Sequence, residues 1–257
     1  MRVRVLAWNT FGMLVRDKLI LVIFAAFVCV VLFMLSPLLF IRSLPGGGQQ
    51  GMVVGLVSLI TSMASGFGSM LAAWSSASAV ANEIKSGTIL AIMARPVRRW
   101  EFLLAKLLGV QILMAIYVVL MLAMTLTLVS IGGARIHSTL WPLVAYPVVR
   151  YALYSAIALL LVTRMHPLIA FVIVMVLGAL AGLATPDSMM LPAGLRHAIY
   201  YVLPSFDLLS EARFVAITQA QLKTLPWTNH LTTLVYGLDW AAVFFLLAAW
   251  SFRRRPL

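Results

Sequence analysis

Long runs of apolar residues alternate with short polar stretches along the chain. Each run approaches the length of about 20 residues that an α-helix needs to cross about 30 Å of hydrocarbon. The six runs cover residues 19–41, 52–74, 107–129, 144–162, 167–184 and 231–252. Because only helices and closed barrels satisfy their backbone groups inside a bilayer, the pattern predicts an all-α membrane protein with a single transmembrane domain over residues 1–257.

The composition agrees with the pattern. Hydrophobic residues make up 63% of the chain and charged residues only 10%, whereas a soluble domain carries about 25% charged residues. The net charge of +12 would suggest nucleic acid as the partner of a soluble protein. Here the basic residues flank apolar spans, as membrane orientation requires, so we expect no nucleic-acid partner.

The first 18 residues place apolar and basic side chains on opposite faces at helical spacing. We expect residues 1–18 to form a helix in the membrane interface, anchored by Trp8. A simple tail preceding the first span is the alternative.

The basic residues predict the orientation of the spans. An even number of spans places both basic termini on one side, and cytoplasmic termini put most of the 19 Lys and Arg residues on that side. These residues are Arg2, Arg4, Arg16, Lys18, Lys85, Arg95, Arg98, Arg99, Lys106, Arg164, Arg253, Arg254 and Arg255. We therefore expect both termini in the cytoplasm.

The outer connection at 185–230 is longer than the others and contains several prolines. Between the prolines, 194–203 and 205–222 are too polar to span, so we expect short amphipathic helices at the outer interface, with Ser205 as an N-cap. Their aromatic side chains are expected at headgroup depth. These are Tyr200, Tyr201, Phe206 and Phe214.

The most charged stretch, 81–106, falls between the second and third spans. Arg95-Pro96 breaks any helix there, because proline disfavours a helical residue before it. We expect a helical elbow parallel to the membrane, carrying charges as well as apolar residues at 89–93. Such an elbow is suited either to docking a soluble partner or to dipping into the lipid interface among anionic headgroups.

The order of residues in this elbow is specific. Glu83 is followed by Gly87-Thr88, Leu90, Arg95-Pro96-Val97-Arg98, Glu101 to Leu104, and Lys106. This order resembles that of permease subunits of type 2 ABC exporters. The stretch 201–209 and the six-span architecture are similar to the same family. The chain departs from the family pattern at 82, 84 and 85, where further acids are common, and at Ala105, where Gly is common.

The resemblance implies that the elbow contacts a cytoplasmic ABC ATPase subunit. The residues it assigns to this contact are Glu83, Lys85, Gly87, Thr88, Leu90, Arg95, Pro96, Arg98 and Arg99. It also implies two ATPase copies carrying ATP and Mg²⁺, a second permease copy or a paralogue, and a bacterial or archaeal cytoplasmic membrane. The implied activity is export, with no particular substrate selected.

The chain itself lacks a nucleotide-binding motif. No lysine follows a glycine anywhere in the sequence, so the Gly-Lys pair of a P-loop does not occur. We expect the chain not to be an enzyme, and to bind no cofactor of its own. An ion-coupled carrier or channel is the main alternative function, and an intramembrane enzyme a more distant one, because neither HExxH nor GxSxG occurs.

Small residues recur every three or four positions in and just beyond the second span. They are Ser58, Ser62, Ser65, Ser69, Ala72 or Ala73, and Ser76. In lipid such a stripe serves helix packing, or alternatively lines a substrate path. The pairs Gly51/Gly55 and Gly178/Gly182 also favour packing.

Arg150 and Asp239 are ionisable residues inside predicted spans. Because a charge inside the bilayer is costly, each should pair, reach water or face a cavity. We predict an ion pair between them; contact with an anionic or amphiphilic substrate and snorkelling are the alternatives. The four His residues are scattered without Cys or carboxylate neighbours at ligand spacing, so we expect no metal site.

Overall fold

A computed structural model describes residues 2–43, 49–85, 98–132, 141–183, 203–210 and 227–254. Throughout these ranges the regular structure is helical and no strand occurs. The elements are α1 (Arg2–Val15), α2 (Lys18–Ser43), α3 (Gln49–Lys85), α5 (Arg99–Gly132), α6 (Pro142–Val162), α7 (Pro167–Leu183), the 3₁₀ helix η1 (Phe206–Leu209) and α10 (Trp227–Arg253). The prediction of an all-α membrane protein is consistent with this architecture.

Among the described helices, five are long and apolar enough to cross a membrane. They occupy Lys18–Pro37, Gly51–Ile84, Arg99–Ile131, Leu143–Val162 and Thr228–Arg253. The predicted fifth span corresponds to α7, which has 17 residues and therefore a length of about 26 Å. This length lies at the lower limit for a span. The described helices therefore provide five crossings without α7 and six with it.

Two helices are much longer than the spans predicted for them. α3 has 37 residues, a length of about 55 Å, and α5 has 34 residues, about 51 Å. α3 continues beyond 74 because Ser75, Ser76, Ala77 and Ser78 pack inside the bundle. These small residues carry little hydropathy, so an apolar-run analysis ends the span too early.

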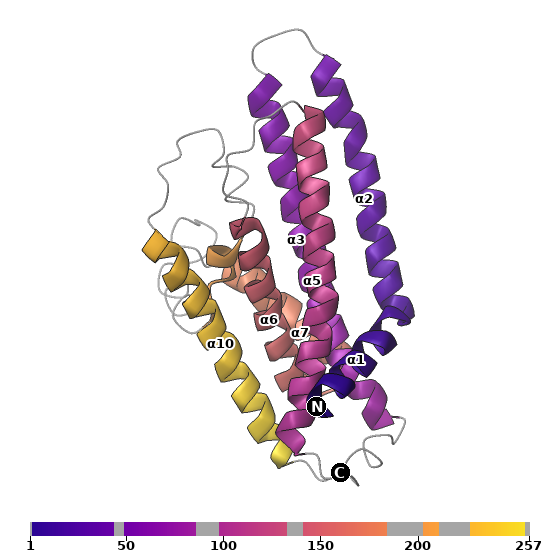
Figure 1. Cartoon of the computed structure of the whole chain (residues 1–257), viewed down its shortest axis with the longest axis vertical. Helices are drawn as coiled ribbons and strands as arrows, with labels where there is room; N and C mark the ends of the chain where they lie inside the picture. Colours follow the sequence, from indigo (N-terminus) through magenta and orange to yellow (C-terminus); the bar gives the residue numbers. More distant parts are fainter. Residues whose placement is uncertain are drawn as a thin grey trace.

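α3 and α5 stand side by side; α2 runs along their upper part, and α1, α6, α7 and α10 lie beside their lower part (Figure 1). α6 contacts α3, α5 and α10, and α1 packs on the first part of α5. The end of the bundle where α3 ends and α5 begins is called the base. The beginning of α1 and the last turn of α10 also lie at the base (Figure 1).

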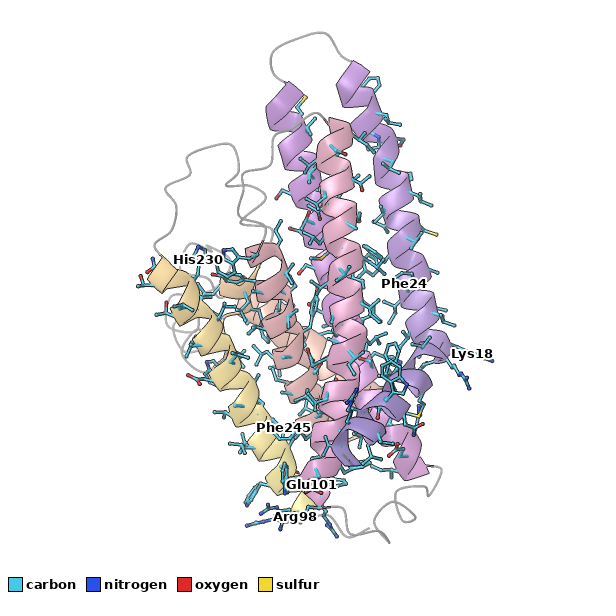
Figure 2. All side chains as sticks on the ribbon, viewed as in Figure 1. Lys18, Phe24, Arg98, Glu101, His230 and Phe245 are labelled. Atoms are coloured by element: carbon cyan, nitrogen blue, oxygen red, sulfur yellow. The ribbon has the colours of Figure 1, made fainter. Side chains whose placement is uncertain are left out.

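Large apolar side chains cover the outer surface of the bundle (Figure 2). Phe33 on α2 is 72% exposed, Val119 on α5 is 62% exposed and Leu246 on α10 is 66% exposed. A soluble protein rarely exposes so much contiguous apolar surface. These side chains are therefore suited to contact lipid.

α1 is a helix, as the amphipathic pattern predicts, and one of its faces packs against the bundle. Ala7, Thr10 and Leu14 are buried, and a Cβ on Gly109 of α5 would lie 2.7 Å from the Ala7 carbonyl oxygen. The opposite face carries Trp8, which is 66% exposed. One face of α1 therefore belongs to the protein core.

Tyrosine side chains fill the centre of the bundle where glycines leave room. Tyr151 is fully buried and lies against Gly68 of α3, where a Cβ would overlap its hydroxyl. Tyr117 donates a hydrogen bond to the Ala64 carbonyl at 2.5 Å and contacts Tyr151 edge-on at 6.0 Å between ring centroids. In lipid, such close approach and interhelical hydrogen bonds replace the hydrophobic drive of soluble cores.

Phe206, which the sequence predicts at headgroup depth, is covered by other parts of the protein. It is 3% exposed, and its ring contacts that of Tyr154 of α6 in a tilted arrangement, with ring centroids 4.4 Å apart. The Ser205 backbone N–H donates to the Tyr236 hydroxyl of α10 at 3.0 Å. η1 is thus anchored in the core between α6, α7 and α10; Tyr200, Tyr201, Phe214 and the rest of the two predicted amphipathic helices fall outside the described residues.

Replacing Gly68 with alanine is expected to destabilise the protein by about 1–3 kcal/mol, because the added methyl displaces the Tyr151 ring from a filled core. The matched control is Gly66→Ala, two residues away, where no atom lies within 4 Å of the added Cβ. Thermal unfolding of the purified protein in detergent checks both. Equal melting temperatures for the two variants would contradict the close packing of α3 on α6.

Candidate functional site

The predicted contact residues between α3 and α5 are only partly described. Gly87, Thr88, Leu90, Arg95 and Pro96 lie in the 86–97 connection, outside the described residues. Lys85 is the last residue of α3, whereas Arg98 and Arg99 lie where α5 begins. The structure therefore shows how the connection is anchored at both ends.

Glu83 forms a buried ion pair with Lys106 of α5. Lys106 is 2% exposed and Glu83 is 7% exposed. The Lys106 ammonium also donates to the Thr10 hydroxyl of α1 at 3.1 Å and lies 5.5 Å from the centre of the Phe102 ring. One cation thereby joins the end of α3, the beginning of α5 and the middle of α1.

This geometry gives Glu83 a partner inside the chain. Its carboxylate is paired with Lys106 where α1 and α5 pack over the end of α3, and its contact with a partner subunit stays a prediction. Breaking one side of a buried pair leaves an uncompensated charge, at a cost of about 3–5 kcal/mol. The pair therefore fixes the positions of three helices at the base.

Arg99 ties the beginning of α5 to the end of α10. Its guanidinium donates to the Phe252 carbonyl at 3.2 Å and to the Arg253 carbonyl at 3.0 Å. The last carbonyls of a helix lack intrahelical partners and carry a partial negative charge, so a cation stabilises them. The phenyl rings of Phe102 and Phe252 stack beside this contact, with centroids 5.8 Å apart.

Arg98 differs from its neighbour in being exposed at the base (Figure 2). Its backbone N–H donates to the Glu101 carboxylate at 3.0 Å, which is the contact that a glutamate three residues into a helix makes with the N-cap. The carboxylate also suits the positive start of α5. The Arg98 side chain is thus presented outward from a well-defined helix start.

A second polar cluster joins the turn after α6 to α10. The Arg164 Nε donates to the Ser251 hydroxyl at 2.9 Å, and the hydroxyls of Thr163 and Ser251 lie 2.9 Å apart. Thr163 and Ser251 are buried. Together with the contacts of Lys106 and Arg99, this cluster connects the end of α3, the beginning of α5, the turn after α6 and the end of α10.

Arg150 and Asp239 do not form the predicted ion pair. The Arg150 guanidinium donates to the Ser65 hydroxyl of α3 at 2.6 Å and lies 5.9 Å from the centre of the Tyr154 ring. Asp239 is exposed on α10. Gly237 and Ala241 are buried on the face of α10 that packs inward, so a residue midway between them points to the opposite face.

The serine stripe separates into two parts. Ser65, Ser69 and Ser76 are buried, Ser58 is half-buried and Ser62 is exposed. Ser69 donates to the carbonyl of Ser65 within its own helix at 3.0 Å. The buried members thus pack against the bundle, with Ser65 also serving Arg150.

Only one of the four glycines in the two predicted packing pairs makes a close contact within the described part of the chain. A Cβ on Gly178 would overlap the Tyr154 hydroxyl, whereas Gly51, Gly55 and Gly182 meet nothing within 4 Å.

Several contacts at the base were not predicted from the sequence. In the sequence, Thr10 and Ser251 are ordinary polar residues within helices, and nothing beside them indicates a contact. The contact of Arg99 with a helix end depends on a segment more than 150 positions away. The sequence analysis included Lys106 in the family pattern but assigned it no partner. The one available signal was a lysine inside a helix at the edge of hydrocarbon, which must find an anion.

Comparison with known families gives one match over nearly the whole chain. A model of the family described as ABC-2 family transporter protein matches residues 4–257. The matched range includes every described element except the first residues of α1. No curated protein gave a match.

The ion pair predicts a strong coupling between two substitutions. Glu83→Gln or Lys106→Met alone is expected to destabilise the folded protein by about 3–5 kcal/mol, because each leaves the other charge buried without its counter-ion. The double variant removes both charges and is expected to recover most of the loss. Thermal unfolding of the four proteins in detergent measures the coupling. Additive single effects would show that the two side chains act independently.

Proposed function

Because the chain belongs to the ABC-2 family of transporter proteins, and is thus the multi-pass permease subunit of an ABC transporter, we propose that it exports its substrate across the cytoplasmic membrane. ATP hydrolysed by a separate subunit would drive export. Membership in the family implies association with an ABC ATPase subunit, and the Gly-Lys pair of a P-loop does not occur in this sequence. ATP and Mg²⁺ would then be bound by that partner.

The proposed assembly has two ATPase subunits beneath two permease subunits, the second being an identical copy or a paralogue. The base would face the ATPases, with both termini in the cytoplasm. The basic residues near the base support this orientation.

The observation that carries the proposed mechanism is the anchoring of both ends of the 86–97 connection. Lys106 holds the end of α3 to α5 and α1, and Arg99 holds the beginning of α5 to α10. A push on the connection would therefore tilt these four helices together. Rigid-body movement of packed helices is a common way in which a local displacement opens or closes a distant path.

In this mechanism the buried and the exposed charges have different tasks. Glu83 and Lys106 keep the helices together during the movement, whereas the exposed Arg98 is suited to contact an acidic group of the ATPase. The remaining predicted contact residues, Lys85, Gly87, Thr88, Leu90, Arg95 and Pro96, complete the proposed contact surface.

Purification of the tagged chain in mild detergent tests the assembly. We expect a soluble partner to copurify and to hydrolyse ATP in the presence of Mg²⁺, with activity lost when the partner is removed. Substrate transport by the reconstituted chain alone under an ion gradient would instead identify an ion-coupled carrier and would refute the proposal.

The contact assigned to Arg98 can be tested in the same preparation. Arg98→Glu is expected to lower the copurified ATPase about tenfold, equivalent to about 1.4 kcal/mol of association, because like charges repel across an interface. Arg42→Glu makes the same charge change in the last turn of α2, at the opposite end of the bundle (Figure 1), and should leave copurification unchanged. Equal loss in both variants would argue against a specific contact at Arg98.

A further inference from the structure

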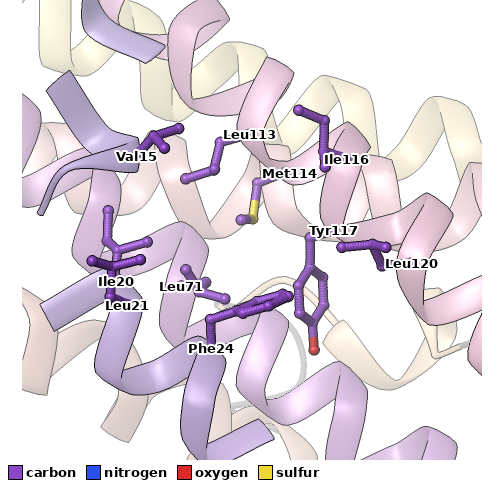
Figure 3. Close-up of a pocket in the computed structure, with 10 residues that line it drawn as sticks. All are labelled: Val15, Ile20, Leu21, Phe24, Leu71, Leu113, Met114, Ile116, Tyr117 and Leu120. Atoms are coloured by element: carbon purple, nitrogen blue, oxygen red, sulfur yellow. The ribbon is translucent and has the colours of Figure 1, made fainter. Parts of the chain in front are cut away.

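An apolar groove lies where α1 turns into α2 and both approach α5 (Figure 3). Val15 of α1, Phe24 of α2 and Leu71 of α3 form one part of its wall, and Leu113 and Leu120 of α5 form another. The space unfilled by protein atoms, including the open mouth, is about 460 Å³. Part of the wall is exposed on the outside of the bundle.

The lining offers a ligand almost nothing but hydrocarbon. Tyr117 carries the only hydroxyl among the lining residues, and that group already donates to the Ala64 carbonyl. A polar ligand group inside the groove would therefore lose its hydrogen bonds to water at a cost. The part of a ligand that fits here is an alkyl chain.

Two basic residues of the α1–α2 turn adjoin the lining residues of the groove in the chain. Arg16 and Lys18 lie within three positions of Val15 in the wall, and both are exposed. Lys18 points away from the bundle (Figure 2). Asp17 stands between them, but its carboxylate accepts the Leu19 backbone N–H at 3.0 Å and caps the beginning of α2. The two cations remain available to an anion outside the protein.

We propose that this groove binds an anionic phospholipid from the surrounding bilayer, with one acyl chain against α5 and the phosphate at Lys18 and Arg16. A phospholipid joins an alkyl chain to an anion, and here an apolar wall is followed in the chain by two exposed cations. Basic side chains beside a membrane surface favour anionic over zwitterionic headgroups. The bound lipid would hold the α1–α2 turn against α5, and this inference does not depend on the direction of transport.

Photo-crosslinking in bilayers tests the proposal with the full chain and its copurifying partners. The probes are phosphatidylglycerol and phosphatidylcholine that carry a diazirine in the same acyl position, and the labelled peptides are identified by mass spectrometry. We expect phosphatidylglycerol to label the groove segments of α2 and α5 more strongly than phosphatidylcholine does. Lys18→Gln and Arg16→Gln should each reduce this labelling about fivefold, the factor that one basic residue near an anionic surface contributes.

Two control variants distinguish the groove from its surroundings. Arg4→Gln removes the same charge from an exposed position of α1. Arg4 lies about 18 Å from Arg16 along the helix, so this variant should leave groove labelling unchanged. Ile116→Trp fills the groove from an exposed lining position and should reduce labelling. Val119→Trp, also exposed on α5 but outside the lining, should not.

Equal labelling by the two lipids would overturn the proposal and show contact with bulk hydrocarbon only. Absence of adducts from either lipid in the groove segments would also overturn it and show that no lipid chain enters the groove. Size-exclusion profiles confirm that each variant is folded before labelling is compared. Because copurification of the ATPase is measured separately, failure of the lipid site leaves the proposed transport function intact.

Discussion

A buried lysine at the edge of hydrocarbon constrains the whole base of this protein. Lys106 needs a counter-ion in a medium of low dielectric constant, and Glu83 supplies it from the end of α3. The same ammonium reaches Thr10 of α1, so an amphipathic helix that could have lain freely in the interface is joined to the bundle. The positions of three helices depend on satisfying this one charge.

The remaining packing follows from the absence of a hydrophobic drive between helices in lipid. Helices associate there through close fit and hydrogen bonds, and Gly68 and Gly178 provide the space for Tyr151 and Tyr154. The aromatic rings in turn contact neighbours on other helices, as Tyr154 contacts Phe206. Close fit in the centre and polar braces at the base thus stabilise the same bundle by different means.

The base and the neighbouring groove are formed by different kinds of contact. At the base, Arg99 and Ser251 connect α5 and the α6–α7 turn to the end of α10 through directional hydrogen bonds. The α1–α2 turn contacts α5 across an apolar groove instead. A braced base suits the transmission of a push from a partner, and the lipid that we propose would occupy the groove beside it.

The sequence by itself determined the all-α membrane class and, through the order of residues from Glu83 to Lys106, the family, which the match over residues 4–257 confirms. Hydropathy could indicate the membrane class because the length of a span depends on the bilayer and on local composition alone. The tertiary structure decided which charges meet: Arg150 contacts Ser65 and not Asp239, and Glu83 is enclosed by α1 and α5. These choices depend on the rotation of each helix about its axis, which is set by packing against residues far away in the chain.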